Sequence, residues 1–88
     1  MNFSKLEKIV KGFSNHRRIE ILNLIDKKPE MSLSEISDEL KINLKTACEH
    51  VRRLVISGLV IKRHENNSVR HKITKLGKSI LMFLRTLE

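Results

Sequence analysis

The chain has 88 residues and a formal net charge of +8, and only 3% of its residues are aromatic. This length allows one small domain with a marginal hydrophobic core, for which association with a second copy is a common remedy. The few aromatic residues argue against recognition of single-stranded nucleic acid by base stacking. The excess of Lys and Arg favours a polyanionic partner such as duplex DNA.

The sequence carries no usual signal for export or membrane insertion. Cys48 is the single cysteine, so no disulfide can form within one chain, which fits a reducing compartment. The start from Met1 to Lys5 lacks the pattern of a signal peptide, and no apolar run approaches the ~20 residues of a membrane-spanning helix. We therefore expect a cytoplasmic protein without membrane contact, folded as one domain over residues 1–88.

Two helices are predicted in the first third of the chain. For the first helix, Ser4 and Glu7 could form a capping box, and Gly12 marks the end. For the second helix, Asn15 is the expected N-cap and Pro29 the stop. Apolar residues recur at helical spacing in both, at Phe3, Leu6, Ile9, Val10 and Phe13, and then at Ile19, Ile21, Leu22, Leu24 and Ile25.

A pair of short helices follows, joined by a tight turn. Ser32 and Glu35 form a capping-box pattern before the first of them. The turn Lys41–Asn43 ends in an Asn that can cap the second helix, which runs to Ser57. Gly58 then stands where a left-handed residue commonly ends a helix. The inward positions are Leu33, Ile36 and Leu40 in the first helix, and Ala47, Val51, Leu54 and Val55 in the second.

Alternation then replaces helical periodicity. Residues Leu59–His64 and Ser68–Ile73 predict two strands, with Glu65–Asn67 as their turn because Asn tolerates positive φ. Thr74 can cap a final helix, whose apolar stripe comprises Leu76, Ile80, Phe83 and Leu87, widened by Leu84. The predicted fold class is therefore mainly α with a small β-hairpin, in the order helix, helix, helix-turn-helix, hairpin, helix.

The positive charge is concentrated in one stretch. From Lys45 to Lys78 there are nine Lys or Arg and two acids, a net of +7, whereas the rest of the chain carries +1. The helix before the tight turn contains Glu35, Asp38 and Glu39 and would be repelled by phosphate, whereas the helix after it is basic. This second helix is the predicted reader of duplex DNA, and a basic surface kept only for solubility is the alternative.

Helical periodicity sorts the side chains of this second helix. With Ala47, Val51 and Leu54 inward, the outward face and its flanks hold the candidates for DNA contact, which are Leu44, Lys45, Thr46, Cys48, Glu49, Arg52 and Arg53. Lys45 and Arg52 are predicted to contact bases or phosphates. Glu49 either accepts a hydrogen bond from a cytosine amino group or repels phosphate.

The hairpin supplies a second set of cations. Period-two alternation places Val69, His71 and Ile73 on one face of its second strand, and Arg70 and Lys72 on the other. A hairpin beside a DNA-reading helix would lie along the phosphate backbone or an adjacent minor groove. The predicted phosphate contacts are Lys62, Arg63, Arg70 and Lys72.

Several segments between Asn15 and Lys78 resemble those of a known family. The stretch Asn15–Ile25 resembles the second helix of ArsR-like winged helix-turn-helix regulators. The segments Ser32–Leu40 and Thr46–Leu54, with Ser57-Gly58-Leu59-Val60, look like their helix-turn-helix, and His71–Lys78 is similar to a strand-to-helix junction shared with MarR- and PadR-like regulators. The resemblance implies a homodimer built from the first and last helices that binds an inverted-repeat operator. The candidate interface residues are Leu6, Ile80, Phe83, Leu84 and Leu87.

Two departures from the family bear on metals and ligands. Metal-sensing members carry a Cys-x-Cys in the first helix of the motif, where this chain has Ser and acids, and the segment Ser79–Glu88 has no His ligand. The four His lie on different elements without convergent spacing, so we expect no metal, no cofactor and no small-molecule effector. The turn residues Asn66 and Asn67 replace the usual Gly or Arg.

The sequence thus predicts a transcriptional regulator that binds double-stranded DNA, and not an enzyme, because no nucleophile and base are suitably spaced and the Gly residues form no phosphate loop. For Cys48, a small residue packed against DNA is favoured over a redox switch. Two alternative functions stay open, an architectural protein that binds DNA without sequence preference and a winged-helix module that binds proteins.

Overall fold

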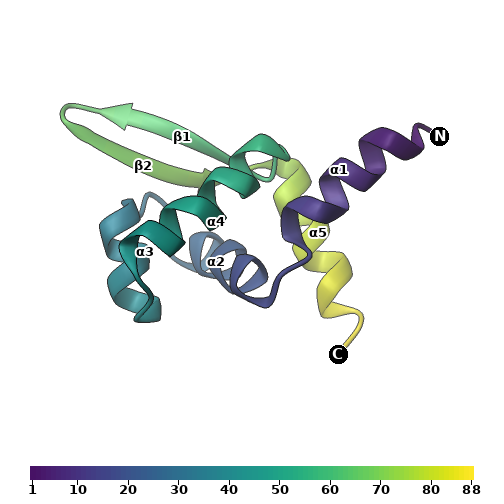
Figure 1. The fold of residues 1–88 in the computed structure, drawn as a ribbon, viewed down its shortest axis with the longest axis horizontal. Helices are drawn as coiled ribbons and strands as arrows, with labels where there is room; N and C mark the ends of the chain where they lie inside the picture. The colour runs from purple at the N-terminus through teal and green to yellow at the C-terminus, as the bar shows by residue number, and fades with distance from the viewer.

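The helices and strands of the computed structural model, which describes residues 1–88, follow the predicted order (Figure 1). The fold class, mainly α with one hairpin, is confirmed, and the two strands form one antiparallel sheet. The elements are α1 (Phe3–Phe13), α2 (His16–Lys27), α3 (Leu33–Leu40), α4 (Leu44–Ile56), β1 (Val60–Glu65), β2 (Ser68–Ile73) and α5 (Lys75–Arg85).

Four predicted N-caps are confirmed. The side chains of Asn15, Asn43 and Thr74 accept hydrogen bonds from backbone N–H groups in the first turns of α2, α4 and α5. Ser32 and Glu35 form the complete capping box of α3, in which each side chain bonds the other residue's backbone N–H. Caps of this kind are each worth about 1 kcal/mol, so the start of each helix is specified within three or four residues of sequence.

The predicted boundaries of α1 are wrong at both ends. Asn2 is the N-cap, not Ser4, because its side chain accepts from the N–H of Lys5. Gly12 does not end the helix but lies buried within its last turn, where α1 crosses α4. A Cβ at this position would lie 2.2 Å from Oγ of Ser57, so the absence of a side chain is what allows the two helices to approach.

The core lies where α2 packs against α4, α5 and the base of the hairpin, with α3 packed against α4 (Figure 1). Its largest fully buried side chains come from four elements, α2, α3, α4 and β1, and from the loop that joins α4 to β1: Ile21, Leu22, Ile25, Ile36, Val51, Leu54, Leu59 and Val60. All three predicted inward residues of α4 that orient its outer face, Ala47, Val51 and Leu54, are buried. Helix α4 is therefore packed against the core along the side opposite its outer face.

The hairpin projects from this core as a wing (Figure 1). Its register pairs Val60 with Ile73 at the base and Glu65 with Ser68 at the tip, so β1 begins and ends one residue later than predicted. Asn66 takes the predicted left-handed conformation in the turn, with φ of 55°. The loop between α2 and α3 runs beside β2 and forms an isolated bridge from Met31 to His71.

Candidate nucleic-acid interface

The outward face of α4 is the first part of the candidate interface. All seven predicted contact residues of this helix are exposed: Leu44, Lys45, Thr46, Cys48, Glu49, Arg52 and Arg53. Lys45 and Arg52 are seven residues apart and therefore lie on one face, two turns from each other. The structure brings these side chains together on one accessible helix surface, and their contact with DNA stays a prediction.

Charges of both signs alternate on this face. Oε1 of Glu49 lies 3.2 Å from Nε of Arg53 and 3.5 Å from NH1 of Arg52. Exposed pairs of this type contribute about 1 kcal/mol or less, so a phosphate or a guanine could displace Glu49 from Arg52 at little cost. The longer contact belongs to Arg52, so Glu49 holds the guanidinium of Arg52 less tightly than that of Arg53.

The wing divides its four predicted phosphate contacts between two faces. Lys62 stands opposite His71 in the register, whereas Arg63 stands opposite Arg70, so Lys62 lies on the other face from the two arginines. The predicted alternation is confirmed at the base of β2, where His71 and Ile73 are buried and Lys72 is exposed, whereas Val69 and Arg70 are both half-buried. These four cations therefore cannot form one row.

The two arginines of the wing are engaged by acids. Arg63 pairs with Glu30 and, at 2.7 Å, with Glu65, and NH1 of Arg70 lies 2.9 Å from Oε1 of Glu35. The hydrogen bond from Arg63 lowers the pKa of Glu30, and the backbone N–H of Ser32 is the main cause of the lowered pKa of Glu35. The lysines predicted to contact DNA, Lys45, Lys62 and Lys72, make no ion pair in the structure.

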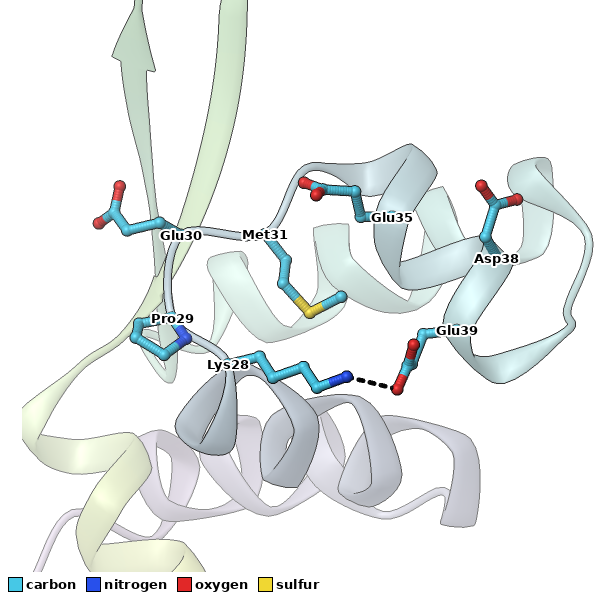
Figure 2. Close-up of a pocket in the computed structure, with 7 residues that line it drawn as sticks. All are labelled: Lys28, Pro29, Glu30, Met31, Glu35, Asp38 and Glu39. Atoms are coloured by element: carbon cyan, nitrogen blue, oxygen red, sulfur yellow. Dashed lines mark hydrogen bonds and ion pairs between the residues drawn. The ribbon is translucent and has the colours of Figure 1, made fainter.

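An acidic pocket lies beyond the wing, between the end of α2 and α3 (Figure 2). It is lined by Lys28, Pro29, Glu30, Met31, Glu35, Asp38 and Glu39. Figure 2 shows Lys28 reaching across it to Glu39, with Nζ and Oε1 separated by 2.7 Å. Arg63 and Arg70 pair with two of its four carboxylates, those of Glu30 and Glu35, and Lys28 pairs with Glu39. The pocket therefore offers no unpaired cation to a phosphate backbone, which makes this side of α3 an unfavourable surface for DNA.

Hydrogen bonds from Arg18 link α1, α2 and α4, and the sequence did not predict them. Nε of Arg18 donates to Nδ1 of His50 at 3.3 Å, and NH1 of the same guanidinium donates to the carbonyl of Lys11 at 2.9 Å. Arg18 on α2 thereby joins the end of α1 to the middle of α4. Burial, followed by the charge of Arg18, lowers the pKa of His50.

Helices α1 and α5 lie at the end of the molecule away from the wing (Figure 1), and both carry exposed apolar side chains. Of the predicted interface residues, Leu6, Phe83 and Leu87 are 39%, 55% and 66% exposed, and Ile80 and Leu84 are half-buried against the core. Leu81, which the predicted stripe omitted, is the α5 side chain that closes the core. Further exposed apolar residues that sequence reasoning left out of the interface are Phe3, Val10 and Met82.

A family model described as winged helix-turn-helix DNA-binding matches residues 14–61, which comprise α2, α3, α4 and the start of β1. The chain belongs to this winged helix-turn-helix family. A curated relative is the uncharacterized protein MJ0944 of Methanocaldococcus jannaschii, which is 34% identical over 68 residues, 72% of this chain. The chain spans 57% of the length of that relative.

Two solved structures resemble this winged helix over nearly its whole length. The DNA-binding domain Mb0332 of Mycobacterium bovis, described as homodimeric and as "a possible ArsR-family transcriptional regulator", has a TM-score of 0.87 at 24% identity, covering 96% of this chain and 78% of that one. Reduced HlyU of Vibrio cholerae has a TM-score of 0.81 at 28% identity, covering 98% and 90%. The predicted resemblance to ArsR-like regulators is thus confirmed in the fold.

Other candidate chemistry in this winged helix is sparse. No three His, Cys, Asp or Glu side chains converge on one point, and Cys48 is an exposed free thiol on α4. None of the helices is both long enough and apolar enough to span a bilayer.

Lowering the pH is expected to destabilise the winged helix through His71. This side chain is buried and its Nδ1 lies 2.9 Å from the carbonyl of Met31, which can only accept, so Nδ1–H donates. Burial lowers the pKa of His71 below its ordinary value of 6.5. The stabilisation is therefore present above pH 6.5 and is lost as the pH falls from 6.5 through the folded-state pKa.

Thermal unfolding between pH 7.5 and 5 measures this effect. His71→Gln keeps a donor for Met31 but cannot titrate, so its stability should fall less steeply over this range than that of the wild type. His50, whose lowered pKa acts in the same direction, supplies the slope that remains. His64→Gln, on the exposed part of the wing, is the matched control. Equal slopes for wild type and His71→Gln would contradict the assignment.

Proposed function

We propose that this winged helix is a homodimeric transcriptional regulator that binds double-stranded DNA sequence-specifically, with α4 in the major groove. The observation that carries the proposal is the exposed face of α4, on which Lys45, Glu49 and Arg52 present a donor, an acceptor and a second donor along one line. Base edges in the major groove display distinct patterns of donors and acceptors, so a face of mixed charge can discriminate among them. A uniformly basic face would favour binding without sequence preference.

The proposed roles follow from position and charge. Arg52 and Lys45 contact bases or phosphates, Glu49 restricts the accepted base, and the flanking residues shape the contact surface: Leu44, Thr46, Cys48 and Arg53. Lys62 and Lys72 on the wing contact phosphates without having to break an ion pair first. Arg63 and Arg70 are ion-paired and are not among the proposed phosphate contacts.

Dimerisation through α1 and α5 completes the proposed binding unit. Exposed apolar residues on α1 and α5 are unfavourable in a monomer, and burying them against a second copy removes that cost. Mb0332, which shares this fold, is described as homodimeric, and this supports the association of two copies. A two-fold dimer would place its two α4 helices on half-sites of an inverted repeat, about 10 base pairs apart from centre to centre.

Substitutions in α4 and in the wing should affect DNA binding differently. Arg52→Ala is expected to lower affinity for the preferred duplex by about 10- to 100-fold and to relax the preference at one base pair. Lys72→Ala should weaken binding to all duplexes alike and reduce the slope of log affinity against log salt by about 0.9. Fluorescence anisotropy with the preferred duplex and single-base variants, at several salt concentrations, separates the two. The reverse pattern would show that the two roles are interchanged.

Selection of bound duplexes from a random pool at near-physiological salt tests the function itself. An enriched inverted repeat is the expected result. Retention without enrichment and with a steep salt dependence would instead establish an architectural DNA-binding protein. If no duplex is retained, the proposal fails, and a protein-interaction module becomes the favoured function.

A further inference from the structure

The two arginines of the wing stand in an arrangement that would be unfavourable by itself. Arg63 and Arg70 are direct cross-strand partners, and like charges directly opposite each other destabilise a hairpin. Three carboxylates surround this pair and neutralise it, those of Glu30, Glu35 and Glu65. Two of these three belong to the segment between α2 and α4, not to the wing.

Glu30 binds the wing through both its backbone and its side chain. Its N–H donates to the carbonyl of His71 at 3.1 Å, and the N–H of His71 donates back to Met31 at 3.0 Å. The carboxylate of Glu30 accepts hydrogen bonds from two nitrogens of Arg63, of which Nε lies at 2.8 Å. Glu30 has φ of 69°, a left-handed conformation that residues other than Gly rarely adopt. Figure 2 shows its side chain on the side of the loop that faces the strands.

Glu35 joins the wing to the start of α3. Its Oε1 accepts from the backbone N–H of Ser32 at 2.8 Å and from NH1 of Arg70 at 2.9 Å. The same NH1 lies 3.3 Å from the carbonyl of Glu30. Arg70 is only 33% exposed at its side chain, the least exposed cation among the ion-paired residues of the chain. The capping box of α3 and the wing therefore share one carboxylate oxygen.

We propose that Arg63 and Arg70 are positioning residues, which hold the wing at a fixed angle to the helix-turn-helix through Glu30 and Glu35, and that they do not contact DNA phosphates. The inference rests on the proposed function, because the angle matters only if α4 and the wing engage the same duplex. Arg52 is held by one contact of 3.5 Å, whereas Arg63 is held by two carboxylates and Arg70 by a carboxylate and a backbone carbonyl. To reach a phosphate, either wing arginine would have to break several contacts together, whereas Lys62 and Lys72 would break no ion pair.

Glu35→Gln distinguishes positioning from direct contact by the sign of its effect. The substitution removes a negative charge near the DNA and frees Arg70, so a phosphate-contacting Arg70 would bind DNA more tightly. A positioning Arg70 predicts weaker binding, by about threefold to fivefold, which is the usual size for one partly exposed ion pair. Gln can still accept from Ser32, so the capping box of α3 is kept.

Arg70→Gln should weaken DNA binding by the same threefold to fivefold as Glu35→Gln, without changing the slope of log affinity against log salt. Lys62→Gln is the matched control, since it removes one cation from the opposite face of the wing and should lower the slope of log affinity against log salt by about 0.9. Tighter binding by Glu35→Gln, or a slope lowered by about 0.9 in Arg70→Gln, would overturn the proposal.

Hydrogen exchange in the free protein tests the link without DNA. The amides of Glu30 and His71 form the bridge between loop and wing, so Glu35→Gln and Arg70→Gln should each raise their exchange rates about threefold to fivefold. Lys62→Gln should leave these rates unchanged. Unchanged rates in all three variants would overturn the proposal. Should wild type retain no duplex while the rates respond as expected, the DNA-binding function fails and the link between wing and α3 stands.

Discussion

Gly77→Ala is expected to lower the free energy of unfolding by about 3 kcal/mol, at the upper end of the usual cost of overpacking a core. A Cβ at this position would lie 2.3 Å from the carbonyl oxygen of Leu59 and 2.6 Å from Cγ1 of Ile73. Leu59 is fully buried, and its carbonyl accepts the N–H of Thr74 at 3.0 Å. The obstacle is backbone at the junction of α4, the wing and α5, so no side-chain rotation can relieve it.

Urea denaturation and thermal unfolding measure this cost, for which we expect the melting temperature to fall by roughly 12–24 °C in a domain of this size. Ser79→Ala, an exposed change on the same helix, is the control and should stay within about 0.5 kcal/mol of wild type. The intrinsic preference of helices for Ala over Gly, about 1 kcal/mol, acts in the opposite direction. A Gly77→Ala protein as stable as wild type would contradict the close approach of α5 to Leu59.

The contrast between the helix starts and Gly12 shows which features the sequence could predict. Asn15, Asn43 and Thr74 cap helices through backbone groups two or three residues away, so the sequence contains both partners of each hydrogen bond at readable spacing. Gly12 resembles a helix end because Gly commonly follows one. Its actual role depends on Ser57, which is 45 residues distant and approaches only when α1 crosses α4.

The same distinction applies to the candidate site. The outward face of α4 could be predicted because helical periodicity alone decides which side chains lie opposite Val51 and Leu54. The engagement of Arg70 by Glu35 could not, since the two are 35 residues apart and meet only through the path of the loop between α2 and α3. Net charge over the stretch from Lys45 to Lys78 therefore does not reveal that four of its arginines are ion-paired in the free protein.

Phe83→Glu is expected to convert the proposed dimer into a folded monomer. The side chain is 55% exposed in the single chain, so a carboxylate there costs the monomer little, whereas two of them facing each other across a two-fold interface would be desolvated and repelled. Sedimentation velocity at micromolar concentration should show half the wild-type mass, with the helical circular dichroism signal unchanged. Ile61→Glu is the matched control for assembly, because it places the same charge on an apolar residue 50% exposed on the wing.

The loss of the dimer should weaken binding to an inverted repeat by about 100-fold or more, because linked half-sites gain effective concentration that separate monomers lack. Binding to a duplex with a single half-site should change little, since Phe83 belongs to α5 and the candidate DNA contacts belong to α4 and the wing. Equal weakening on both duplexes would mean that Phe83 supports the fold and not the assembly. A Phe83→Glu protein that remains dimeric would place the interface elsewhere and leave the apolar residues of α1 and α5 without this role.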